Sequence, residues 1–228
     1  KWRYLTIRIK ENDIMDQEIE IINTETRKEK LKNFFINNKK LIIIVIFFLL
    51  LLLFGFIFYK EYQKGHREFL ANKYNTAIIE HETGEKSKIV KLMKEIIEDK
   101  DETFSPLAFY YLLDNDLITS NEEINKYFDI LIEEVDLEEE NKNLTIFKKG
   151  IFNSEFVSEN ELLGILNPVI KSKSIWKPHA LYLMAEYYFA KQERKKSKEF
   201  LEQIISLEEI SVKIKSEAQK RLRSDFSE

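Results

Sequence analysis

A run of nineteen residues without a charged side chain, Leu41–Tyr59, is the strongest constraint on what this chain can fold into. As a helix the run would be roughly 28 Å long, close to the thickness of the hydrocarbon core of a bilayer. A secretory signal has a shorter apolar region that ends in small residues, whereas this run ends in bulky side chains followed by Lys60. A core helix of a soluble protein is rarely apolar on all its faces over such a length. The run therefore predicts one uncleaved transmembrane helix over residues 41–59.

Basic residues flank the run unequally. Six of them stand between residues 27 and 40, and four stand between residues 60 and 73. Because the more basic flank usually stays in the cytoplasm, we expect the N-terminus to be cytoplasmic and residues 60–228 to lie on the outer side of the membrane.

The two flanking parts of the chain also differ in net charge. Residues 1–40 carry a net charge of +3 and residues 60–228 a net charge of −7. An acidic outer part argues against a nucleic-acid partner, which requires a basic surface, while the lysines before the run would attract acidic lipids of the bilayer. The chain has no cysteine, which excludes a lipoprotein anchor, a disulfide framework and thiolate metal sites.

Residues 1–40 are predicted to form a short cytoplasmic tail. Tyr4–Lys10 alternates apolar and polar residues as an edge strand does, although one strand alone cannot bury a face. Met15 would make a natural start of the protein. Residues 26–35 fit a basic amphipathic helix that leads into the membrane, and a merely solvated tail is the alternative.

Apolar residues recur at spacings of three and four throughout residues 60–228. No stretch there alternates convincingly with a period of two, so we expect an all-α domain of eight or nine helices. Predicted helix starts are Ser105 as an N-cap with Pro106 at the first helical position, Ser120 or Asn121, and a capping box of Ser158 and Glu161.

Helix pairs form the predicted unit of this domain, and His179–Ile205 is the strongest of them. Its first helix has Met184, Ala185 and Tyr188 where a tetratricopeptide repeat has a large residue, a small residue and a tyrosine. Small residues let paired helices approach closely, and large ones fill the gap between them. The unit departs from the repeat at Ile204, which is larger than the usual alanine, and in lacking the closing proline.

A spacing of four and then three residues recurs in the second helix of each unit. Twelve residues before Ile89 stands a small residue, Ala77, but the equivalent place before Ile124 is held by Leu112. Stacked pairs bury faces that none could bury alone, so the pattern predicts a degenerate tetratricopeptide-like α-solenoid. The spaced residues are Ile89, Met93 and Ile96, then Ile124, Phe128 and Leu131, and finally Ser197, Leu201 and Ile204.

The last segment is predicted to be a terminal helix with one apolar stripe and a charged exterior, as the end of a solenoid requires. The stripe consists of Ile214, Ala218, Leu222 and Phe226.

A charged tail, one membrane helix and helix pairs together form a known layout. TRKEKLKNFFINNKKLIII enters the membrane, FSPLAFYYLL opens the second helix pair, and SEAQKRLRSDF ends the chain. The chain resembles the ancillary subunit family of the bacterial Sec translocon, whose members have one membrane span and a periplasmic tetratricopeptide-like domain. The resemblance implies a non-enzymatic protein of the inner membrane that associates with translocon subunits, periplasmic chaperones and newly exported proteins. Relative to that family, the segment before Met15 is extra.

No catalytic, cofactor-binding or metal-binding residue is nominated. His66, His81 and His179 form no helix-spaced pair, and five glycines leave no phosphate-binding loop. The acidic stretch Glu133–Asn141 is explained by a solvated linker, since catalytic carboxylates need burial to shift their pKa. We therefore expect no enzyme activity and no small-molecule substrate.

Aromatic triplets stand on two predicted first helices, at residues 109–111 and 187–189. Most of these aromatic side chains are expected to lie in the core. Each helical residue advances by about 100°, however, so a triplet cannot face the core completely. Repeat geometry would direct five residues into a protein-binding groove: Phe109, Leu113, Tyr182, Glu186 and Phe189.

Two functions follow as hypotheses. The first is a membrane-anchored adaptor that links exported proteins to the translocon and to chaperones. The alternative is a scaffold or accessory subunit of another inner-membrane complex, in which the Gly55 face of the membrane helix would pack against a partner.

Overall fold

The computed structural model describes residues 26–81, 84–208 and 210–226, and every regular element in these ranges is a helix. The chain divides after Gly65 into two units. The predicted strand at residues 4–10 lies outside the described residues. The all-α prediction is confirmed for the part of the chain that the structure describes.

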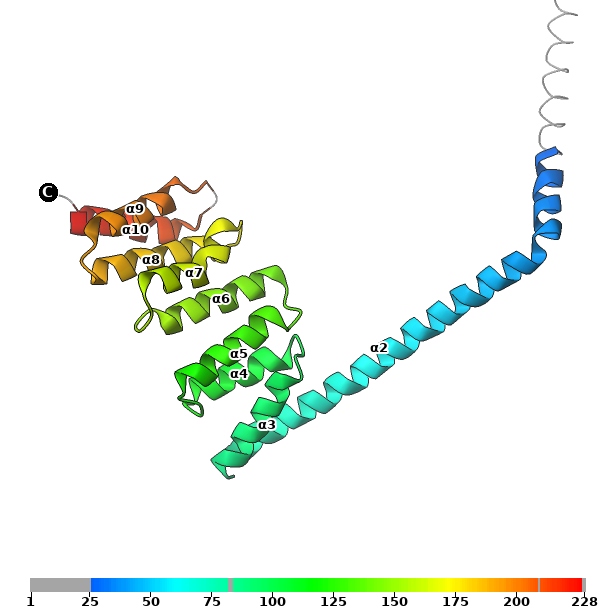
Figure 1. Ribbon diagram of the computed structural model, residues 1–228, viewed down its shortest axis with the longest axis horizontal. Coiled ribbons are helices and arrows are strands. Elements are labelled where there is room, and N and C mark those ends of the chain that lie inside the picture. Colours follow the sequence, from blue (N-terminus) through cyan, green and yellow to red (C-terminus); the bar gives the residue numbers. More distant parts are fainter. Residues whose placement is uncertain (1–25, 82–83, 209, 227–228) are drawn as a thin grey trace, which may run out of the picture. The chain divides into compact units, whose positions relative to one another are not determined.

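The first unit contains a helix at residues 26–37 and, after a turn at Asn38, the start of α2 (Lys39–His81) (Figure 1). This is the one helix of the described ranges that is long and apolar enough to cross a membrane. The predicted span, residues 41–59, lies inside it, and its side chains are exposed on all sides.

The helix α2 does not end with the apolar run. No proline follows Tyr59 before His81, and Leu70, Tyr74 and Ala77 continue the spacing of four and three. In the second unit, Leu70 and Ala77 are buried, so the last part of α2 serves as the first helix of the helical domain.

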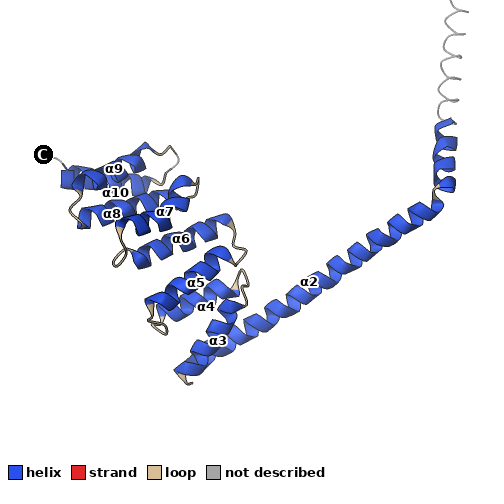
Figure 2. Cartoon of the chain, in the orientation of Figure 1, coloured by secondary structure: helices blue, strands red, loops and turns tan. Residues whose placement is uncertain are grey.

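Eight further helices follow in the described part of the second unit (Figure 2). Each packs against the next one along the chain, and α3 also contacts α5, α6 contacts α8, and α8 contacts α10. Their bounds are α3 Lys86–Glu98, α4 Phe104–Asp114, α5 Asn121–Glu133, α6 Glu139–Asn153, α7 Glu159–Lys171, α8 Lys177–Ala190, α9 Arg194–Ser206 and α10 Val212–Phe226.

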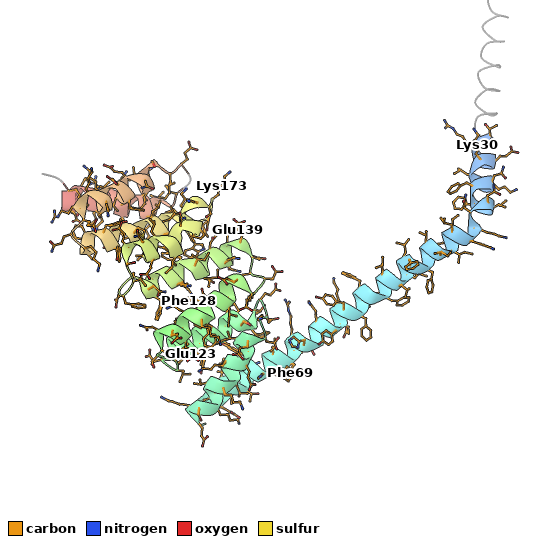
Figure 3. All side chains as sticks on the ribbon, in the orientation of Figure 1. Lys30, Phe69, Glu123, Phe128, Glu139 and Lys173 are labelled. Carbon is orange, nitrogen blue, oxygen red and sulfur yellow. The ribbon has the colours of Figure 1, made fainter. Side chains whose placement is uncertain are left out.

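The core of this unit consists of three successive apolar clusters, one from the end of α2 to α5, one from α6 to α8 and one from α8 to α10. All nine residues with the spacing of four and three on α3, α5 and α9 are buried, which confirms that this pattern marks the core face. Phe128 of α5, labelled in Figure 3, is fully buried in the first cluster. Its ring centroid lies 4.8 Å from that of Phe109 and 6.0 Å from that of Phe152.

Two of the three predicted helix starts are confirmed, and the third is wrong. Ser120 and Ser158 accept hydrogen bonds from the backbone N–H groups of Glu123 and Glu161, and Glu161 completes the capping box. The prediction for Ser105 is wrong, because this residue lies inside α4, fully buried, with its hydroxyl donating to the carbonyl of Ile96. Asp101 satisfies the start of α4 instead, accepting from the backbone of residues 103 and 104.

The terminal helix α10 confirms the predicted stripe. Ala218 is fully buried, and Ile214, Leu222 and Phe226 pack against the third cluster.

Close approach of α6 and α7 requires a glycine at position 150. A methyl group there would overlap the buried side chain of Leu166, whereas a methyl group on Gly164 of α7 would meet no atom within 4 Å. We expect Gly150→Ala to lower the free energy of unfolding by about 1–3 kcal/mol through overpacking. Gly164→Ala is the matched control and should raise it by about 0.5–1 kcal/mol, because alanine favours the helix.

Urea unfolding followed by the fluorescence of Trp176, which packs against the second cluster, measures both effects. The other tryptophan, at position 2, is replaced by phenylalanine in every variant. Equal stability of the Gly150→Ala variant and its parent would contradict the packing of α6 on α7.

Candidate functional site

Three helices of the second unit, α6, α8 and α10, enclose a groove with a volume of about 530 Å³. Its walls are mainly apolar and aromatic, which is typical of sites that hold apolar groups of a ligand or a peptide. The lining residues are Phe147 and Ile151 from α6, His179, Tyr182, Leu183 and Glu186 from α8, Ser211 before α10, and Lys213, Ile214 and Glu217 from α10.

A second hollow of about 420 Å³ adjoins the first. It shares His179, Ser211 and Ile214 with the first hollow and adds Ile175, Trp176, Pro178 and Ile210. Because the shared residues form walls of both, the two hollows meet at the start of α10. The name "groove" below covers both hollows.

An aromatic cluster stands where the hollows meet. The ring of Phe147 is stacked on Trp176 at 6.0 Å between centroids, and His179 lies 5.8 Å from Phe147 and 5.1 Å from Trp176. The Nδ1 atom of His179 is buried and has no hydrogen-bond partner among the described residues. The cluster therefore offers flat apolar surface together with one polar atom whose hydrogen-bonding capacity is unused.

An ion-pair network fixes the end of the groove near Glu186. The guanidinium of Arg221 donates from Nε and Nη2 to Glu186 Oε1, at 3.0 and 2.7 Å, and pairs with Asp225 at 2.6 Å. The same group lies over the ring of Phe189 at 4.7 Å. The carboxylate of Glu186 is thus paired with Arg221, and this pair links α8 to α10.

Two pKa values reflect this arrangement. Burial raises the pKa of Tyr182, and the negative charge of Glu186 raises it further. Burial lowers the pKa of Arg221, but the hydrogen bond and the charge of Glu186, together with Asp225, outweigh this effect and raise the pKa overall. Arg221 therefore stays ionised, and Tyr182 stays neutral, around neutral pH.

The five residues predicted to face a groove are placed differently from one another. Tyr182 and Glu186 do line the groove. Phe109 is fully buried in the first cluster, so its predicted exposure in a groove is wrong. Leu113 is half-buried against that same cluster on α4, and Phe189 packs against Phe226 at 6.1 Å between centroids, outside the lining of the groove.

The aromatic half of the groove, formed by Phe147, Trp176 and His179, was not predicted from the sequence. A signal was present, because Trp176 and His179 stand three residues apart at the start of a helix marked by Pro178. The contribution of Phe147 could not be predicted from the local sequence, because Phe147 lies on α6, whereas Trp176 and His179 lie at the start of α8. Among the described residues there is no group of three side chains suited to holding a metal ion.

The Arg221 network yields a direct prediction. Arg221→Gln should loosen α10 and lower the stability of the last helices by about 1 kcal/mol, because charge-assisted hydrogen bonds to a half-exposed carboxylate are lost. Hydrogen exchange of the α10 backbone relative to α5 measures this effect. Lys198→Gln is the control, since Lys198 and Glu202 form an exposed pair at 3.9 Å. Equal exchange of α10 in both variants would contradict the role given to Arg221.

Comparison with known proteins supplies no relative. No protein-family model, no curated protein and no solved structure matches the chain.

Proposed function

We propose that this chain is a non-catalytic, membrane-anchored protein-interaction module, and that its groove holds an apolar segment of another protein. The observation that carries the proposal is the groove between α6, α8 and α10, with its aromatic cluster. Its rim includes apolar side chains that stand in solvent, Ile151 at 48 % and Ile175 at 67 % exposure. Covering such side chains with a partner is favourable in proportion to the apolar area removed from water.

Side-chain bonds between alternate helices support the solenoid part of the proposal. Tyr110 on α4 bonds to Thr145 on α6, and Glu186 on α8 bonds to Arg221 on α10. Both links join residues that are 35 positions apart, close to the period of about 34 residues of tetratricopeptide repeats. Stacked repeats of this kind use the surface of alternate helices for binding proteins.

The long apolar part of α2 supports anchoring in a membrane. The excess of basic residues before it supports a cytoplasmic N-terminus, with the helical domain on the outer side of the membrane. The resemblance of the layout to the translocon family suggests that this membrane is a bacterial inner membrane. In this arrangement the groove would meet proteins as they leave the membrane. We propose that the partners are translocon subunits, periplasmic chaperones and exported clients, as the layout of the chain suggests.

Photocrosslinking in intact cells tests the groove. A photoreactive residue at Tyr182 should yield protein adducts that mass spectrometry identifies as a translocon subunit, a chaperone or an exported client. Ile214→Glu, which places a charge in the apolar groove, should reduce these adducts about tenfold, since one lost apolar contact is worth about that factor.

Phe156 is the control for this experiment, because it is 49 % exposed and lies outside the groove. Equal adducts from positions 182 and 156, or full adducts in the Ile214→Glu variant, would contradict binding in the groove. Adducts confined to components of an unrelated complex would contradict the link to translocation.

A second candidate function is that of an accessory subunit held in another membrane complex by α2. A shallow recess of about 520 Å³ surrounds Gly55, walled by Leu51, Phe54, Phe58, Tyr59 and Tyr62. Glycines in membrane helices often mark the place where a second helix approaches closely.

This candidate predicts that Gly55→Leu abolishes co-purification of the partner subunits from solubilised membranes. The isolated chain should tolerate the change, because nothing lies within 4 Å of a Cβ atom at this position. Leu52→Phe is the matched control outside the recess, since Leu52 is not among the residues that wall it. Unchanged co-purification of the Gly55→Leu variant would favour a simple tether.

A further inference from the structure

The helix at residues 26–37 carries an apolar face that no described residue covers. Leu31, Phe34 and Phe35 are each more than half exposed. An exposed cluster of this size on a soluble surface is unfavourable, so a partner of matching chemistry is expected.

The residues around this apolar face are mostly polar or charged. With a turn of about 100° per residue, Leu31, Phe34 and Phe35 share an arc of roughly 100°. Lys28 and Lys32 border the arc on one side and Lys30 on the other. Glu29 and Asn33 lie opposite together with Ile36, and Arg27 lies within the arc at the N-terminal end of the helix. Lysines at the borders of an apolar face place their charges at headgroup level while their stems stay in the apolar layer.

Charge complementarity indicates the kind of partner. Residues 26–40 contain six basic side chains and one acidic side chain, Glu29. A segment of this composition next to a membrane is attracted by anionic headgroups, and Lys30 projects outward from the helix (Figure 3).

The chain bends where this helix meets α2. The helix ends at residue 37, a turn follows at Asn38, and α2 begins at Lys39 (Figure 1). The carbonyl of Phe34 accepts from both the backbone N–H and the side chain of Asn38, at 3.0 and 2.9 Å. A bend at this point allows the first helix to lie along a membrane surface while α2 enters the bilayer.

We propose that the helix at residues 26–37 binds anionic lipid headgroups and lies in the plane of the interface, on the side from which α2 enters. Leu31, Phe34 and Phe35 insert between the lipids, and Lys28, Lys30 and Lys32 contact the headgroups. This inference rests on the proposed anchoring by α2 and adds a recognition of lipid charge that a simple anchor does not require.

The absence of cysteine from the chain makes the test direct. A single cysteine is introduced at Phe35, on the apolar face, or at Asn33, on the opposite face, and carries an environment-sensitive fluorophore. Each full-length chain is reconstituted into vesicles of neutral phosphatidylcholine or of phosphatidylcholine with phosphatidylglycerol. We expect the probe at position 35 to shift to the blue and to be quenched by lipid-borne quenchers in the anionic vesicles, while the probe at position 33 stays in water.

Charge variants separate lipid recognition from simple burial. Replacing Lys28, Lys30 and Lys32 together by glutamine should lower the ratio of surface-bound to water-exposed helix roughly a hundredfold, since each lysine near an anionic surface contributes a factor of about five. Replacing the same three residues by arginine should leave it unchanged. The proposal is overturned if the two probes respond alike, if neutral vesicles give the same shift, or if the glutamine variant keeps it.

Flotation of the same samples separates this outcome from failure of the anchor. A chain that floats with both kinds of vesicle but shows no shift at position 35 keeps the anchor and refutes the lipid-binding helix. A chain that floats with neither kind refutes the anchor itself, and with it the inference that depends on it.

Discussion

From α3 to α9, each helix of the second unit packs its apolar face against the next helix in the chain. Alanines at the contacts keep the helices close, with Ala77, Ala108, Ala180 and Ala185 all fully buried. Gly150 allows an even closer contact between α6 and α7. Polar pairs add specificity, as between Asn125 and Asn153, which exchange side-chain hydrogen bonds of 3.1 and 2.8 Å across α5 and α6. Because the contacts are mostly sequential, the core is divided into three clusters in chain order.

This arrangement leaves a groove between α6, α8 and α10. The wall of this groove consists of side chains at the edge of the core, several of which also pack against it. On α8 these include His179 and Tyr182, and Ile214 faces them from α10. The Glu186–Arg221 link holds the two helices at a separation that leaves the groove open. The groove thus arises from the same stacking that stabilises the domain.

The periodic features could be predicted from the sequence, but the alignment of α4 with α5 could not. The apolar run, the buried stripes and the caps at Ser120 and Ser158 depend on local patterns, and they were predicted correctly. The predicted place of Phe109 was wrong because the small residue of α4 was expected twelve positions before Ile124. That is the distance between Ala185 on α8 and Ser197 on α9. The loop between α4 and α5 has six residues, whereas that between α8 and α9 has three. Counting fifteen positions back gives Phe109 itself, which occupies the buried place of Ala185.

The groove could be predicted only in part, because its walls come from separate helix pairs. The proposal that another protein occupies the groove is tested most directly by the reactivity of a single cysteine, introduced at Ile151, toward a water-soluble maleimide. Ile79→Cys, at a site that is 71 % exposed outside the groove, is the control. We predict that position 151 reacts more slowly in native membranes than in the purified chain, while position 79 reacts alike in both. Equal reactivity of position 151 in the two preparations would contradict occupation of the groove.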